Sequence, residues 1–279
     1  MLKAVTEGAQ IIRILSDDTD VFVLLVYWTS RMKVVSKIQM EKWNGDVLDI
    51  NETVHRLGPR KCSQLLGTHA LSGRDTVSYP FGKGKKSALK LLEMDIPGLD
   101  HVLGQPGATH AQLQETAYTF FLALYGQKGC TTMNDARAHF YRGHKKPPPL
   151  KKPPPTDANL QLHVLRAHLR MLLWKDADQR DPPEEARNIA NFGWSIEGST
   201  ITPAVSSTPV APQALLDVVS CSCTAEYKAC SGTRCSCNSA GLSCTDYCKC
   251  EGGDICCSPF TSKQMDIEDD EEEPSVDNE

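Results

Sequence analysis

Ten of the chain's twelve cysteines lie in one segment near its C-terminal end. They are Cys221, Cys223, Cys230, Cys235, Cys237, Cys244, Cys248, Cys250, Cys256 and Cys257. Three pairs have Cys-x-Cys spacing, and no histidine interrupts the segment. Cysteines one residue apart cannot readily form an unstrained disulfide with each other, but they can present two thiolates to one ion. Soft thiolate ligands suit zinc, so the segment predicts an all-sulfur zinc site.

The number of cysteines predicts more than one metal ion. Three tetrahedral zinc ions need twelve sulfur contacts, which nine cysteines supply when three of them each bridge two ions. We therefore expect about three zinc ions in this segment. A disulfide framework and unliganded thiols are the alternatives.

A second group of chemically active residues follows the apolar segment 11–15, where Asp17, Asp18 and Asp20 come in close succession. Carboxylates at the C-terminal edge of a sheet can hold magnesium or manganese, and two such ions can support phosphodiester cleavage. A solvated turn with an aspartate helix cap is the alternative. A further aspartate, Asp75, follows Ser72-Gly73-Arg74.

A glycine- and lysine-rich stretch, Phe81-Gly82-Lys83-Gly84-Lys85-Lys86-Ser87, comes shortly afterwards. The two glycines allow a tight turn before a helix. Backbone amides and lysines at such a helix start can grip phosphates. We therefore expect Gly82, Lys83, Gly84, Lys85 and Lys86 to contact a nucleic-acid backbone.

The elements around these residues form an α/β pattern. Apolar spacing predicts strands at 11–15 and 34–38 and helices at 50–57, 62–71, 87–92 and 113–125. The Pro- and Lys-rich stretch 145–155 should be extended and mark a boundary, and Thr156 should start an amphipathic helix over 158–174. The expected organisation is 1–144, a linker 145–156, a helical and loose segment 157–214, a cysteine module 215–260 and an acidic disordered tail 261–279.

Composition bears on the charge, secretion and membrane association of the protein. The formal net charge is -5, but nine of the 35 acidic residues lie between Asp266 and Glu279. Without this acidic tail, the chain is mildly basic. Glu7 and Arg13 interrupt any apolar leader, so secretion is not expected. The longest apolar run, Val21 to Trp28, is too short to cross a bilayer. We expect no membrane role, and a reducing compartment favours metal-bound cysteines over disulfides.

The cysteine segment resembles the tesmin-like CXC domain, whose pattern repeats Cys-x-Cys with single cysteines between the pairs. The resemblance implies a zinc cluster, and DNA binding in some members. Arg234 precedes Cys235, where DNA-reading members tend to carry tyrosine, whereas Tyr247 does precede Cys248. One final cysteine is usual, so the resemblance leaves open which of Cys256 and Cys257 is a ligand.

Residues 4–95 resemble the flap-endonuclease branch of the PIN-like 5′ nucleases, in the order acidic pair, helix, Gly-x-Asp and Gly-x-Gly-Lys-Lys-x-Ala. The resemblance implies a helix-two-turn-helix. It gives Asp18, Asp20 and Asp75 the role of metal ligands, possible vestiges of a catalytic site, and places Lys85 and Lys86 in the DNA grip. The family has further carboxylates upstream, where this sequence has only Glu7, so we expect a truncated or degenerate domain.

Three hypotheses follow from these patterns. The first is a nuclear, DNA-associated zinc protein with a nuclease-like domain, similar to transposon-associated proteins that join the two modules. The second is an active metal-dependent, structure-selective nuclease, and the third is a zinc-containing protein-protein adaptor.

His163 and His168 are off the spacing of a ligand pair, and we expect them to be surface or packing residues.

Overall fold

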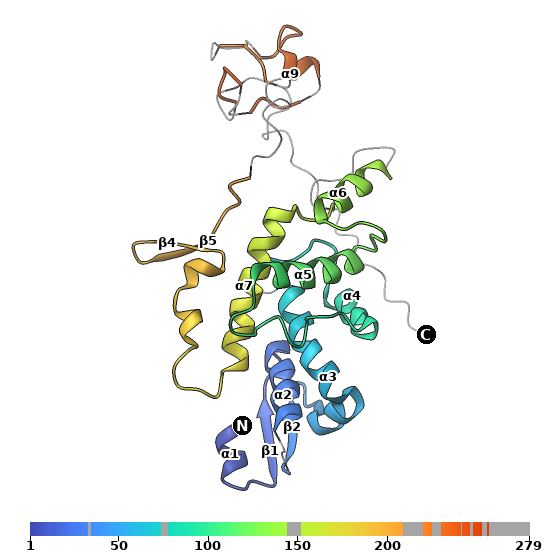
Figure 1. Cartoon of the computed structure of the whole chain (residues 1–279), viewed down its shortest axis with the longest axis vertical. Coiled ribbons are helices and arrows are strands. Elements are labelled where there is room, and N and C mark those ends of the chain that lie inside the picture. Colours follow the sequence, from blue (N-terminus) through green and yellow to red (C-terminus); the bar gives the residue numbers. More distant parts are fainter. Residues whose placement is uncertain are drawn as a thin grey trace. The chain divides into compact units, whose positions relative to one another are not determined.

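The structure, a computed structural model, describes residues 1–32, 35–73, 78–143, 152–208, 220–224, 230–240, 242–245, 248–252 and 256. The chain divides into two compact units, Met1–Ser206 and Ser207–Glu279 (Figure 1). Within the described residues, no helix is both long and apolar enough to cross a membrane.

The N-terminal unit is a mixed α/β assembly, which confirms the predicted fold class at that level. Its helices are α1 (Leu2–Thr6), α2 (Thr19–Arg31), α3 (Ile50–Leu71), α4 (Lys85–Leu89), α5 (His110–Leu124), α6 (Met133–Arg142) and α7 (Asp157–Lys175). Three short 3-10 helices are η1 (Lys90–Met94), η2 (Glu184–Arg187) and η3 (Ile189–Phe192). The strands are β1 (Ile11–Leu15), β2 (Lys37–Glu41), β3 (Val47–Asp49), β4 (Trp194–Glu197) and β5 (Thr200–Pro203).

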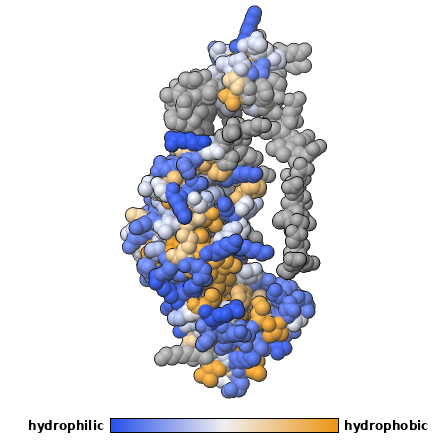
Figure 2. All heavy atoms as spheres, turned by 90° about the vertical axis from the view of Figure 1, so that its right-hand side faces the viewer, coloured by the Kyte–Doolittle hydropathy of each residue, from blue (hydrophilic) through white to orange (hydrophobic). Residues whose placement is uncertain are grey.

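A small sheet with the order β1-β2-β3 carries the acidic residues at its edge. β1 and β2 are parallel, with Ile12 opposite Ile38, and α2 makes the crossover between them. Ile12 and Ile38 are buried, whereas Ile11 and Leu15 on the alternate positions of β1 are exposed. Figure 2 shows apolar side chains on the surface at the end of this unit that carries the sheet.

Side-chain caps set where the main helices begin. The Asp18 carboxylate accepts a hydrogen bond from the Asp20 N–H at the start of α2, and Asp49 caps α3 in the same way. Thr109 and Gln112 form a capping box at α5. Thr156 caps α7, which confirms the predicted start of that helix.

Several predicted bounds differ from the structure. The strand expected at 34–38 begins at Lys37, and the two helices expected at 50–57 and 62–71 are two arms of α3, which kinks at Gly58 before Pro59. β5 lies in the stretch expected to be loose, where it pairs with β4. Helix α7 packs on α3 and α5, so the compact unit continues across the proline-rich stretch to Ser206.

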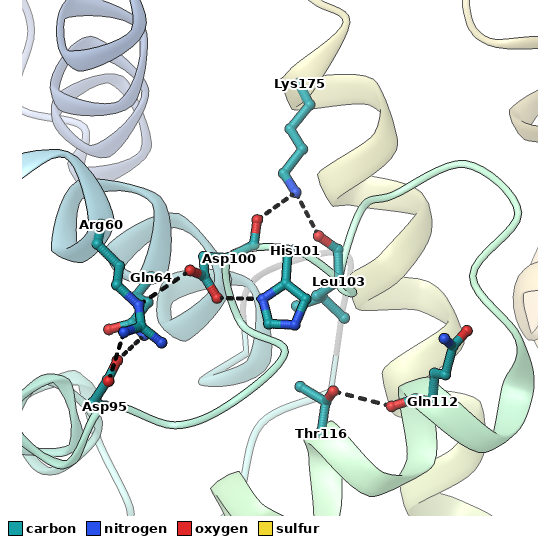
Figure 3. A network of polar contacts seen from close by, with 9 residues as sticks. All are labelled: Arg60, Gln64, Asp95, Asp100, His101, Leu103, Gln112, Thr116 and Lys175. Carbon is teal, nitrogen blue, oxygen red and sulfur yellow. Dashed lines mark hydrogen bonds and ion pairs between the residues drawn. The ribbon is translucent and has the colours of Figure 1, made fainter.

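The loop between η1 and α5 is fixed by polar contacts to two helices (Figure 3). Arg60 of α3 pairs with Asp95 at 2.9 Å and with Asp100 at 3.4 Å. From α7, the Lys175 ammonium donates to the Leu103 carbonyl at 2.7 Å. Burial and the charge of Arg31 lower the pKa of Lys175 to about 8, although the Asp100 charge acts in the other direction.

Two glycines allow this loop to approach the helices closely. Gly98 has φ +87°, and a Cβ there would lie 2.0 Å from the Thr116 Oγ1 on α5. Gly104 has φ +70°, and a Cβ there would lie 2.4 Å from the Met171 Cβ on α7. Both positions therefore need glycine for conformation and for space.

Candidate metal centre and acidic site

The core of the C-terminal unit consists of sulfur. Its described buried cluster contains only cysteines: Cys221, Cys230, Cys235, Cys237, Cys244, Cys248 and Cys250. Cys223 and Cys256 are half-buried and pack against this cluster. Cys257, also a predicted ligand, lies outside the described residues. None of the described cysteines forms a disulfide.

The sulfur atoms have the spacing of metal ligands. Three groups of four thiols have all their sulfurs within 4.8 Å of one another. Close Sγ–Sγ separations in the cluster include 3.5 Å, between Cys237 and Cys248, and 3.9 Å, between Cys250 and Cys256. A tetrahedral zinc ion with Zn–S bonds of about 2.3 Å places its sulfurs about 3.8 Å apart. The thiols therefore fit the edges of such a tetrahedron.

The three groups overlap. Four sulfurs belong to more than one group: Cys221, Cys230, Cys235 and Cys244. Shared ligands are what a cluster with bridging thiolates requires. The arrangement consequently fits several zinc ions that share sulfurs as well as it fits one isolated ion.

Backbone N–H groups support the charged form of two thiols. Asn238 N–H donates to the Cys235 sulfur at 3.4 Å, and the N–H groups of Cys221 and Thr245 lie 3.5 and 3.4 Å from the Cys248 sulfur. Burial alone would raise the pKa of both thiols, but these donors, together with hydrogen bonds from neighbouring side chains, lower it to about 7. Donors around the ligands stabilise thiolates and orient them.

Four other clustered thiols are less acidic than a free cysteine. Burial, with hydrogen bonds to neighbouring sulfurs, raises the pKa of Cys237 to about 11 and raises the pKa values of Cys221, Cys230 and Cys244 further. Neutral thiols dominate these positions until a cation displaces their protons, so metal binding should release protons.

At the sheet edge, the predicted acidic residues have distinct partners. Asp17 accepts from the Trp43 N–H at 3.1 Å, and Asp18 caps α2. The Asp20 carboxylate points inward and lies 2.6 Å from the Nε2 of His69 on α3. Asp75, the third predicted ligand, lies outside the described residues. Among the residues that are described, clusters of three or more metal-ligating side chains consist of cysteines alone.

His69 connects the acidic edge to the lysine-rich turn. His69 is 4% exposed, and its ring stacks on Trp174. The Lys85 ammonium lies 3.1 Å from His69 Nδ1 and can only donate, so Nδ1 accepts and the Nε2–H donates to Asp20. Burial and the Lys85 charge lower the pKa of His69 to about 4, although the Asp18 charge acts in the other direction. A neutral histidine therefore links a cation to a carboxylate.

The lysines of the predicted DNA grip point in different directions. Lys85 is half-buried and also donates to the Gly73 carbonyl at 3.1 Å. Lys83 lies over the Tyr125 ring, and Lys86 is exposed. Gly82 has φ +68° in the turn, and Gly84 precedes the first residue of α4 as its N-cap.

Two further histidines on α7 are buried. His163 is buried and lies 2.9 Å from the Leu71 carbonyl, and His168 accepts from the Gly104 N–H at 2.9 Å.

Sequence reasoning missed His69, because a single histidine 49 residues from Asp20 belongs to no motif. The signal for it in the sequence is its place in the stretch 62–71, whose apolar spacing predicts a helix with a buried face.

Comparison with protein-family models, curated proteins and solved structures found no match to this chain.

Proposed function

We propose that this chain is a DNA-associated zinc protein. In this proposal its C-terminal cysteines hold about three zinc ions, and its nuclease-like N-terminal unit binds nucleic acid without cleaving it. The observation that carries the zinc assignment is the set of clustered sulfurs with neighbours at 3.5 to 3.9 Å. Bound zinc would supply the unit's main stabilising interactions, because its described core has no other apolar side chains.

Metal analysis under reducing conditions tests the zinc assignment. We expect about three zinc ions per chain, with cobalt substitution giving the sulfur-to-metal absorption of tetrahedral thiolate sites. Cys237→Ser should lower the bound zinc, whereas Ser239→Ala, on the same short helix α9 (Ser236–Ser239), should leave it unchanged. A folded module without metal, or one held by disulfides under reductant, would contradict the proposal.

Two observations support binding over cleavage in the N-terminal unit. Asp20 is engaged by His69, and the Lys85 ammonium lies on the other side of the same ring. A pair of divalent ions needs a dense ring of carboxylates, because the two cations repel each other. The active nuclease remains the alternative. If the chain cleaves flap DNA and Asp20→Asn abolishes the cleavage, the active nuclease becomes the preferred function.

Paired lysine variants test the DNA contact. Lys86→Gln should weaken binding uniformly across sequences and reduce the salt slope by about 1, because a phosphate contact releases counterions without reading bases. Lys85→Gln should instead lower stability, because it leaves the Gly73 carbonyl and His69 Nδ1 without this donor. Unchanged affinity and salt slope in a Lys83→Gln, Lys86→Gln double variant would refute DNA binding through this turn.

A further inference from the structure

A pocket of about 310 Å³ opens in the N-terminal unit among α5, α7, η2 and η3. Leu113, Leu165 and Phe192 contribute apolar walls. The volume is about ten times the share of one water molecule in the liquid and lies at the small end of ligand pockets. The space therefore suits a compact organic molecule.

One wall of this pocket holds a buried hydrogen-bond donor that lacks an acceptor. His168 lines the pocket and is only 1% exposed. Its Nδ1 accepts the Gly104 N–H at 2.9 Å, so the proton of the neutral ring is on Nε2. In the described part of the chain, this Nε2 has no hydrogen-bond partner. A buried donor without an acceptor is costly, and a ligand would satisfy it.

A carboxylate lies beside that donor. Glu185 Oε2 accepts the Gly107 N–H at 3.0 Å, which fixes the position of the carboxyl group. Its other oxygen, Oε1, lies 3.9 Å from His168 Nε2, too far for a direct hydrogen bond. His168 and Glu185 thus place a donor and an acceptor in one wall of the pocket, and His110 and Asn191 are among its other lining residues.

This pair restricts the chemistry of the occupant. A metal ion does not suit it, because the protonated Nε2 has no lone pair to offer. An anion would meet the Glu185 charge. The occupant must accept from His168 and donate to Glu185 with neighbouring atoms, and its body must be flat and apolar enough to pack against Phe192 and the leucines. Burial lowers the pKa of His168 to about 4, against the nearby Glu185 charge, which agrees with a neutral ring.

We propose that this pocket binds a neutral nitrogen heterocycle of nucleobase size that carries an amino group next to a ring nitrogen. The ring nitrogen accepts from His168 Nε2, and the amino group donates to Glu185 Oε1. Such a group occurs in a free nucleoside and in an unpaired base of a nucleic-acid strand. The site does not depend on the zinc module.

Calorimetric and NMR titration of the full zinc-loaded chain with adenosine and cytidine tests the proposal. At least one should bind. Purine riboside, which lacks the amino group, and 1-deazaadenosine, which lacks the ring nitrogen, should each bind about tenfold more weakly than adenosine, if adenosine is the ligand. The imidazole proton of His168 should appear on Nε2 and shift when the ligand binds.

Variants at the carboxylate provide the control. Glu185→Gln should weaken binding about tenfold, whereas Glu184→Gln on the preceding residue should leave it unchanged. Glu185 is partly exposed, so this variant should fold, which Trp194 fluorescence can check. A proton on Nδ1, or equal affinity of the wild-type chain and Glu185→Gln, would overturn the proposal.

A single-stranded adenine hexanucleotide distinguishes the two sources. If only the strand binds and Glu185→Gln weakens it, the ligand is an unpaired base. If adenosine alone binds with the same dependence, the ligand is a free nucleoside. If neither the nucleosides nor the strand loses affinity in Glu185→Gln, the pocket does not recognise this group.

Discussion

At the scale of single residues, buried neutral histidines connect the helices of the N-terminal unit. His163 receives a hydrogen bond from the Ser78 hydroxyl on Nδ1, at 2.8 Å, and gives one from Nε2 to the Leu71 carbonyl. Both nitrogens are used in the neutral form. Burial, with a smaller contribution from the Arg166 charge, lowers the pKa of His163 to about 4, against the effect of the Leu71 carbonyl.

The histidines make stability depend on pH. Below pH 6.5 the unfolded chain takes up a proton on His163, whereas the folded chain does so only near pH 4. The contribution of His163 to the free energy of unfolding is therefore fully present above pH 6.5. It falls by about 3 kcal/mol as the pH drops towards 4. Urea unfolding followed by tryptophan fluorescence should show this slope. His163→Gln should make it less steep, with His69 and His168 keeping the rest, and His55→Gln, at an exposed site, should leave it unchanged.

At the scale of elements, the close approach between the loop after η1 and helix α7 depends on Gly104. Gly104→Ala should lower the free energy of unfolding by about 2–4 kcal/mol, because an alanine there is strained at φ +70° and collides with Met171. Gly107→Ala is the matched control, since Gly107 has φ +76° but open space around its Cβ position. We expect about 1 kcal/mol there. Equal losses in the two variants would show that the contact with Met171 does not matter.

Elements with strong local signals could be predicted from the sequence. β1 and the Thr156-capped helix α7 follow from apolar spacing and a capping residue. Three features could not be predicted in this way: the joining of two predicted helices into the kinked α3, the pairing of β4 with β5, and the Asp20–His69 contact. Each depends on contacts between segments, which the local sequence pattern does not specify. The cysteine cluster was predictable because ligand spacing is itself local.

At the scale of the whole molecule, two units have separate cores and separate reporters. All four tryptophans lie before Ser206, and the clustered cysteines lie after it. A chelator such as EDTA should therefore abolish the dispersed NMR signals of the clustered cysteines and leave tryptophan fluorescence and the urea midpoint of the N-terminal unit unchanged. A shift in that midpoint would show that the units are energetically coupled.

The all-cysteine core also constrains how the C-terminal unit can evolve. In an ordinary core, a leucine can be exchanged for another aliphatic residue at modest cost, so the interior drifts by small steps while the fold survives. Here the described cysteines that fill the interior are also the residues that can bind metal. Each exchange would remove a ligand as well as a packing group. The unit therefore has few neutral substitutions inside and should be inherited whole or lost altogether.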